Sequence, residues 1–284
     1  MSGEAKQLGV TDHSRDSAGL TYVYPVVSRR AGGVSVGINL NPNNACNWRC
    51  IYCQVPGLKR GSAPPIDLGQ LERELRGFID TLLHGDFMRK HVPEAARRIV
   101  DIAFSGNGEP TSAREFPDAI ELAGRVVRDT GLEGKVKIRV ITNGSLLGRK
   151  RVQQGLRRLG ELGGEAWFKV DAGSAEGYRR INGVEISPES VARNLHRCAQ
   201  LCPTWVQTCL FALDGTSPGD EEVQAYLDVL ERAGSANLSG VHLYGLARPS
   251  LQPEAERLSR LPQDRLEAIA ARIRALGLAV SVSV

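Results

Sequence analysis

Residues 34–54 read VSVGINLNPNNACNWRCIYCQ, and the fold can be read outward from this stretch. Residues 34–40 are mostly apolar and β-branched, which predicts a buried strand. The asparagines and the proline that follow predict a loop. That loop carries three cysteines, Cys46, Cys50 and Cys53. The segment therefore predicts a thiol-rich loop directly after the first expected strand.

The rest of the chain alternates between short apolar runs and amphipathic segments. Expected strands cover residues 34–40, 99–104, 136–141, 166–170, 205–213, 240–246 and 278–284, and expected helices cover residues 68–83, 115–128, 149–162, 188–201, 220–233 and 264–276. This alternation predicts an α/β fold with parallel strands joined by right-handed crossovers. The count is short of a closed eightfold barrel, so periodicity leaves a partial barrel and a doubly wound open sheet as alternatives. In both, the loops after the strands form the site.

Composition and length indicate an ordinary globular chain of 284 residues, 42% of them hydrophobic and 24% charged. Residues 1–20 are polar and lack periodicity, so we expect a flexible leader, followed by a single domain over residues 21–284. No apolar run reaches the roughly 20 residues that span a bilayer, and no signal peptide is evident. We therefore expect a cytoplasmic protein without a membrane partner, in which grouped thiols indicate metal binding rather than disulfides. The net charge of +4 suits an anionic partner, but solvated helix faces are the interpretation we favour for the basic residues.

The spacing of the loop cysteines, C-x3-C-x2-C, allows three thiolates to converge on one metal cluster. A closed iron–sulfur cluster uses four cysteines, so three leave one iron open to a substrate or cofactor. A structural zinc site needs a fourth ligand nearby. The histidines closest in sequence show no ligand spacing to the cysteines: His13, His84 and His91. A zinc site completed by a distant residue and three unrelated buried cysteines remain as alternatives.

The pattern C-x3-C-x-aromatic-C in a chain of repeated β/α units resembles the radical S-adenosylmethionine (SAM) superfamily. This resemblance implies a partial (β/α)6 barrel of parallel strands with outer helices. It also implies one [4Fe–4S] cluster on Cys46, Cys50 and Cys53, with SAM chelated by the fourth iron. An electron from the cluster then cleaves SAM to methionine and a 5′-deoxyadenosyl radical, which abstracts hydrogen from the substrate. Tyr52 takes the position beside the adenine.

Two later motifs occur in the order that the resemblance requires. After the second expected strand the sequence reads SGNGEPT, which resembles the G-G-E-P motif of the superfamily, with Asn107 in place of the first glycine or inserted beside it. Backbone near Gly108 and the carboxylate of Glu109 can accept hydrogen bonds from the amino group of SAM. Polar residues at the next strand ends bind the carboxylate and the ribose in this superfamily. Asn143 and Asp171 are the candidates, Asp171 for the ribose hydroxyls.

The catalytic residues stay unknown, with Lys169 and Arg248 as candidates. Lys169 could bind a carboxylate or donate a proton, although a solvent-facing strand lysine is an equal alternative. Arg248 follows the sixth strand and could bind a phosphate or carboxylate through its planar fork, and a structural ion pair is as well supported.

Shorter segments resemble the branch of the superfamily that contains the tRNA wybutosine synthesis enzymes. They are residues 28–30, 36–39, 53–54, 169–171, 179–182, 207–208 and 247–249. That branch carries a second cluster on earlier cysteines, and none precedes Cys46. A flavodoxin domain of some relatives is also missing, so a separate flavodoxin or ferredoxin is the expected reductant. The expected substrate is a small metabolite or natural-product intermediate, then a modified nucleoside in tRNA, then a peptide. The rival class is a non-catalytic iron–sulfur or zinc protein.

The remaining cysteines are Cys198, Cys202 and Cys209. The first two are four residues apart on an expected helix and would share one face, and the third lies on the next expected strand. They could hold an auxiliary cluster. Free cysteine is also a common small core residue, and that is the interpretation we favour.

Overall fold

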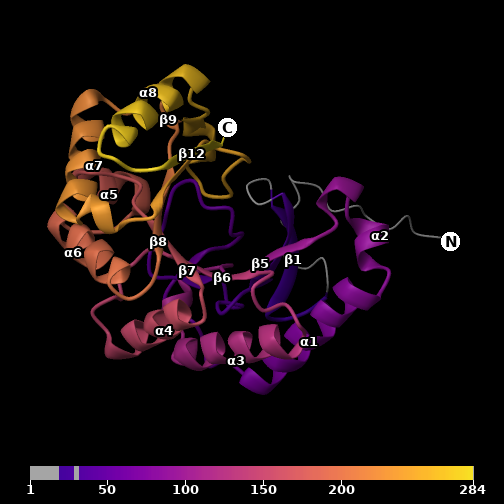
Figure 1. The fold of residues 1–284 in the computed structure, drawn as a ribbon. Helices are drawn as coiled ribbons and strands as arrows, with labels where there is room; N and C mark the ends of the chain where they lie inside the picture. Colours follow the sequence, from indigo (N-terminus) through magenta and orange to yellow (C-terminus); the bar gives the residue numbers. More distant parts are fainter. Residues whose placement is uncertain (1–18, 29–31, 284) are drawn as a thin grey trace.

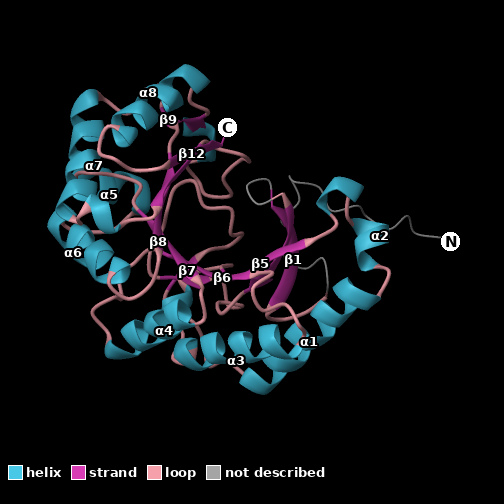
Figure 2. Ribbon diagram, in the orientation of Figure 1, coloured by secondary structure: helices cyan, strands magenta, loops and turns pink. Residues whose placement is uncertain are grey.

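The computed structural model describes residues 19–28 and 32–283, so the expected leader over residues 1–20 lies almost wholly outside the described residues. Eight strands form one curved sheet, and the helices lie along its outer face (Figures 1 and 2). The strand order is β1-β2-β5-β6-β7-β8-β10-β12. The first pair is antiparallel and every other pair is parallel. Strands therefore follow one another in chain order, which confirms the partial barrel and excludes a doubly wound sheet.

The strands of the sheet are β1 (Val23–Ser28), β2 (Gly33–Ile38), β5 (Ile99–Phe104), β6 (Lys137–Thr142), β7 (Glu165–Lys169), β8 (Thr204–Cys209), β10 (Gly240–Tyr244) and β12 (Val280–Ser283). The helices are α1 (Leu68–His84), α2 (Phe87–His91), α3 (Phe116–Asp129), α4 (Lys150–Glu161), α5 (Ala175–Asn182), α6 (Pro188–Ala199), α7 (Asp220–Arg232) and α8 (Gln263–Arg274). Two short strand pairs lie outside the sheet: β3 (Ala45–Cys46) with β4 (Lys59–Arg60), and β9 (Ala212–Leu213) with β11 (Leu258–Ser259). Single 3-10 turns cover Glu94–Ala96, Pro110–Ser112, Ser235–Asn237 and Ala255–Arg257.

Each expected strand has a counterpart, but two expectations about boundaries are wrong. The strand expected over residues 205–213 ends at Cys209, and the chain then leaves the sheet so that β9 pairs with β11. The helix expected over residues 188–201 ends at Ala199. The edge strand β1 was not expected, because Pro25 weakens its signal. A proline is tolerated at an edge, where one side of the strand forms no ladder.

The core lies between the sheet and the helices. Strand residues that face outward are fully buried against the helices, among them Val36, Ile38, Ile102, Phe104 and Val140. Because side chains alternate along a strand, the intervening residues face the inside of the barrel. These inner residues include Gly37, Ala103, Ile141, Lys169 and Gln207. The alternation thus separates a packed outer core from an inner surface that can bind ligands.

A network of charged and aromatic side chains lines the amino-terminal half of the barrel interior. The guanidinium of Arg139 pairs with Asp101 and, at 2.7 Å, with Glu165. The same guanidinium lies 4.9 Å from the ring of Trp167. That ring contacts His242, whose imidazole also stacks on an indole ring, Trp205. These contacts satisfy buried charges and form the floor beneath the site.

Candidate functional site

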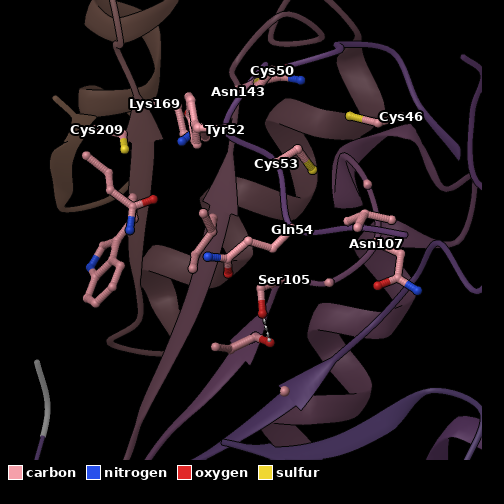
Figure 3. Close-up of a pocket in the computed structure, with 18 of the residues that line it drawn as sticks. Cys46, Cys50, Tyr52, Cys53, Gln54, Ser105, Asn107, Asn143, Lys169 and Cys209 are labelled. Carbon is pink, nitrogen blue, oxygen red and sulfur yellow. Dashed lines mark hydrogen bonds between the residues drawn. The ribbon is translucent and has the colours of Figure 1, made fainter. Parts of the chain in front are cut away.

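A cavity of about 370 Å³ lies at the carboxyl ends of the strands and extends into the barrel. The cysteine loop and the inner faces of the strands line it (Figure 3). Nine of the residues singled out in the sequence line this cavity: Cys46, Cys50, Tyr52, Cys53, Gly108, Glu109, Asn143, Lys169 and Arg248. Asp171 does not line it and lies behind Tyr52, with its side chain inaccessible to solvent. The sequence motifs, which span two hundred residues of chain, therefore meet in one place.

Backbone hydrogen bonds hold the cysteine loop against α5. The amides of Arg49 and Ile51 donate to the carbonyl oxygens of Asn182 and Ile181, each at 2.9 Å. The loop also contributes the short strand β3, which pairs with β4. On the other side, the hydroxyl of Ser250 donates to the carbonyl oxygen of Ile51 at 2.7 Å. These contacts fix the loop against its neighbours on both sides.

The three loop thiols are half-buried and face a common space. The sulfur atoms of Cys46 and Cys53 project toward the same region in Figure 3. Burial raises the pKa of Cys46 to about 11 and that of Cys50 to about 12. Both are therefore protonated at neutral pH until a metal displaces the proton. Among the residues that the structure describes, no three acidic, histidine or cysteine side chains close on a single ion. A four-iron cluster binds each thiolate to a different iron, so it needs a shared space rather than a shared point.

The carboxylate of Glu109 joins the loops that follow β5 and β6. One oxygen accepts from the amide and hydroxyl of Thr111 and from the hydroxyl of Thr142, and the other accepts from the amide of Asn143 at 2.7 Å. Burial raises the pKa of Glu109 despite these donors. The side chain therefore has a positioning role in this structure. Its expected contact with the amino group of SAM stays a prediction.

Asn143 belongs to a hydrogen-bonded group with two residues that sequence reasoning gave no role. Its amide nitrogen donates to Asn47 Oδ1 at 2.9 Å, and its own oxygen accepts from the hydroxyl of Ser145 at 2.7 Å. The amide of Asn47 donates in turn to Ser145 Oγ at 2.7 Å. Asn47 lies between two loop cysteines, so this group connects the cysteine loop to the end of β6. The expected contact of Asn143 with SAM is untested.

Asp171 is a second carboxylate of the site that several donors hold in place. It accepts from the hydroxyl of Tyr52 at 2.5 Å, from the side chain of Asn182 at 2.9 Å and from the amide of Cys209 at 3.2 Å. The ammonium of Lys169 lies 3.6 Å away. Because these donors occupy it, Asp171 reaches a ribose only if Tyr52 gives way, and its predicted role there remains a prediction.

Lys169 points into the barrel cavity and only 16% of its side chain is exposed, so the alternative of a solvent-facing strand lysine is wrong. Its ammonium lies 3.3 Å from the hydroxyl of Tyr244 and 4.9 Å from the ring centroid of Tyr52. Burial opposes its charge, but the Asp171 carboxylate raises the pKa of Lys169 above its ordinary value. A lysine held in its charged form binds anions better than it donates protons. Arg248 lines the cavity mouth and donates to Gln54 Oε1 at 3.3 Å.

Two glycines allow the backbone to approach closely at this site. A β-carbon on Gly108 would lie 2.1 Å from the carbonyl oxygen of Ala45, next to Cys46. A β-carbon on Gly144 would lie 2.0 Å from the ring of Phe168, and its φ of +69° also disfavours other residues. Both glycines are required by packing.

The other cysteines do not form one group. Cys198 and Cys202 belong to the main core, whereas Cys209 packs in a separate small cluster with Ile51 and Phe211. Cys202 lies just past the end of α6, but its amide donates to the carbonyl oxygen of Cys198 at 3.1 Å, so the first two thiols lie side by side as expected. The structure therefore favours core packing over an auxiliary cluster.

The fold and the site together define the class of protein: an open α/β barrel that gathers three cysteines at the carboxyl ends of its strands. The sequence pattern of the radical SAM superfamily matches residues 40–230. The chain therefore belongs to the radical SAM superfamily, as its motifs predicted.

Two curated proteins show how far the sequence similarity of this chain extends. The chain is 30% identical over 159 residues to a UPF0026 protein of Helicobacter pylori (strain ATCC 700392 / 26695), which is 56% of this chain and 44% of that protein. It is also 28% identical over 164 residues to a UPF0026 protein of Methanocaldococcus jannaschii, which is 56% of this chain and 42% of that protein. The chain thus spans less than half the length of these curated relatives.

Solved structures support the fold. The structure of Streptococcus suis SuiB bound to S-adenosylmethionine superimposes with a TM-score of 0.59 and 13% identity, over 90% of this chain and 52% of that one. A radical SAM methyltransferase from Sphaerobacter thermophilus superimposes with a TM-score of 0.60 and 15% identity, over 92% of this chain and 68% of that one. At this identity the likeness establishes the fold alone. No helix in residues 19–28 and 32–283 is long and apolar enough to cross a membrane.

Proposed function

We propose that this chain is a radical SAM enzyme that holds one [4Fe–4S] cluster on Cys46, Cys50 and Cys53. The observation that carries the proposal is that these three thiols line one cavity together with the polar residues of the later motifs. Three soft sulfur donors and no fourth protein ligand in the motif suit a cluster with one open iron. When bound, the cluster would supply one electron for the cleavage of SAM to methionine and a hydrogen-abstracting 5′-deoxyadenosyl radical.

The residues of this chain would bind and orient the cofactors. Tyr52 is held by Asp171 with its ring near the Lys169 ammonium, so it would form a rigid wall beside the adenine. Glu109 and Asn143 would hold the loops after β5 and β6 in place and leave the backbone near Gly108 for the amino group of SAM. The floor network around Arg139 would exclude bulk water from below.

The substrate we propose is a small metabolite or natural-product intermediate. A cavity of about 370 Å³ is in the size range of small-molecule sites. Arg248 at the mouth and the charged Lys169 favour an anionic one. The electron would come from a separate flavodoxin- or ferredoxin-type protein.

Anaerobic reconstitution tests the proposal. Purified chain treated with iron and sulfide should become brown and hold about four irons. Dithionite and SAM should then yield 5′-deoxyadenosine, measured by chromatography. A variant with all three loop cysteines changed to alanine is the control and should give neither. Colourless wild-type protein with one tightly bound zinc would instead support a non-catalytic metal protein.

A further inference from the structure

A buried asparagine contacts one of the proposed cluster ligands. The side-chain nitrogen of Asn182, at the end of α5, lies 3.2 Å from the sulfur of Cys50 and 2.9 Å from a carboxylate oxygen of Asp171. An amide nitrogen carries two hydrogens and can donate to both acceptors at once. Asn182 is inaccessible to solvent. The half-buried sulfur of Cys50 therefore receives a hydrogen bond from a donor that is itself fully buried.

The contacts of Asn182 support this orientation of its amide group. Its side-chain oxygen is buried and has no hydrogen-bond partner within the described part of the chain. Exchanging the oxygen and nitrogen would turn the oxygen toward a sulfur and a carboxylate, both of which are acceptors. The backbone is fixed as well, because its carbonyl oxygen accepts from the amide of Arg49. The next residue, Gly183, ends α5 in a left-handed conformation with φ of 63°.

We propose that Asn182 is a positioning residue that sets the reduction potential of the cluster through its hydrogen bond to Cys50. The proposal rests on the proposed function. A donor on a ligand sulfur stabilises the reduced, more negative cluster more than the oxidised one, and so raises the potential. The nearby Asp171 carboxylate acts in the opposite direction, and Asn182 lies between the two. In the step concerned, the cluster takes one electron from the external reductant, and no bond forms or breaks.

The test compares Asn182→Leu, which keeps the branched shape but removes the donor, with the wild type. Both chains are reconstituted anaerobically, and the reduced cluster is followed by EPR during a potentiometric titration. We expect about a tenfold fall in the ratio of reduced to oxidised cluster at a fixed potential, equal to a shift of about 59 mV to more negative values for one electron.

The matched control is Thr204→Val. The hydroxyl of Thr204 lies 3.4 Å from the sulfur of Cys198, a cysteine of the packed core. This variant also removes a buried donor to a sulfur, so it should lower stability without moving the potential. Equal shifts in both variants, or no shift in Asn182→Leu with its iron intact, would overturn the proposal.

A second variant, Asn182→Ala, removes the donor without adding bulk, so its potential should also become more negative. If both Asn182 variants fold, as judged by circular dichroism, but hold no iron, Asn182 serves cluster assembly and the proposal is wrong. Failure of the proposed function looks different, because the wild type itself would then lack iron or form no 5′-deoxyadenosine.

Discussion

The two sets of cysteines in this chain show what separates a ligand from a packing residue. Cys46, Cys50 and Cys53 lie on a loop and line one cavity. Cys198 and Cys202 fill the core behind the sheet, whereas Cys209 lines the wall of the same cavity and packs in a different apolar cluster. We call the first set the loop cysteines and the second the core cysteines. Both contain three thiols within twelve residues, so close spacing alone does not make a site. Only the loop cysteines have all three thiols on one cavity.

The largest difference between the sets should appear in iron content. We expect Cys50→Ala to lose the cluster and with it all formation of 5′-deoxyadenosine, because two thiolates cannot hold it. Cys198→Ala should retain about four irons per chain. Iron and sulfide assays on both variants after the same reconstitution measure this. A cluster that survives in Cys50→Ala would remove the basis of the comparison.

The close contact between Gly108 and the backbone of the cysteine loop should affect cluster binding almost as strongly. Gly108→Ala places a β-carbon 2.1 Å from the carbonyl oxygen of Ala45, so the strand that carries Cys46 must move. We expect the free energy of unfolding to fall by about 2 kcal/mol or more, with a severalfold loss of cluster. Gly148→Ala is the control, since nothing lies within 4 Å of its added carbon. Urea unfolding and iron content of both variants measure the effect, and an undisturbed Gly108→Ala would contradict it.

Accessibility to alkylation should distinguish the sets without any mutation. The loop cysteines are partly exposed, whereas Cys198, Cys202 and Cys209 are 0%, 5% and 2% exposed. In the apo chain, iodoacetamide should modify the loop cysteines first, and a bound cluster should protect them. The core cysteines should react only after unfolding. Peptide mass spectrometry with and without reconstitution reads this out, and equal protection of both sets would count against the assignment.

The smallest expected effect is on the stability of the apo chain. Here a core cysteine should matter more than a loop cysteine, the opposite of the order expected for iron content. Cys198→Ala empties space in a fully buried position and should lower the free energy of unfolding of the apo chain by about 1 kcal/mol. Cys53→Ala, at a partly exposed position, should change it by no more than about 0.5 kcal/mol. Chemical denaturation of both apo variants makes the comparison. A larger loss in Cys53→Ala would show that the loop thiols also serve packing.

The sequence by itself determined the parts of this protein that are local. Apolar runs alternating with amphipathic segments sufficed for the parallel barrel, because strand and helix periods appear within ten to fifteen residues. The loop cysteines were evident for the same reason, since their spacing places three thiols on one short loop. The edge strand β1 was missed where Pro25 interrupts the pattern.

Only the tertiary structure decided which side chains surround the loop. Asn182 meets Cys50 across 132 residues, and Glu109 meets Asn143 across 34. Asp171 was expected to face the cavity, yet the structure places it behind Tyr52. Such contacts depend on the register of neighbouring strands and on how loops fold over their ends. Periodicity carries no information about either, because every register that keeps the same face inward satisfies the same pattern.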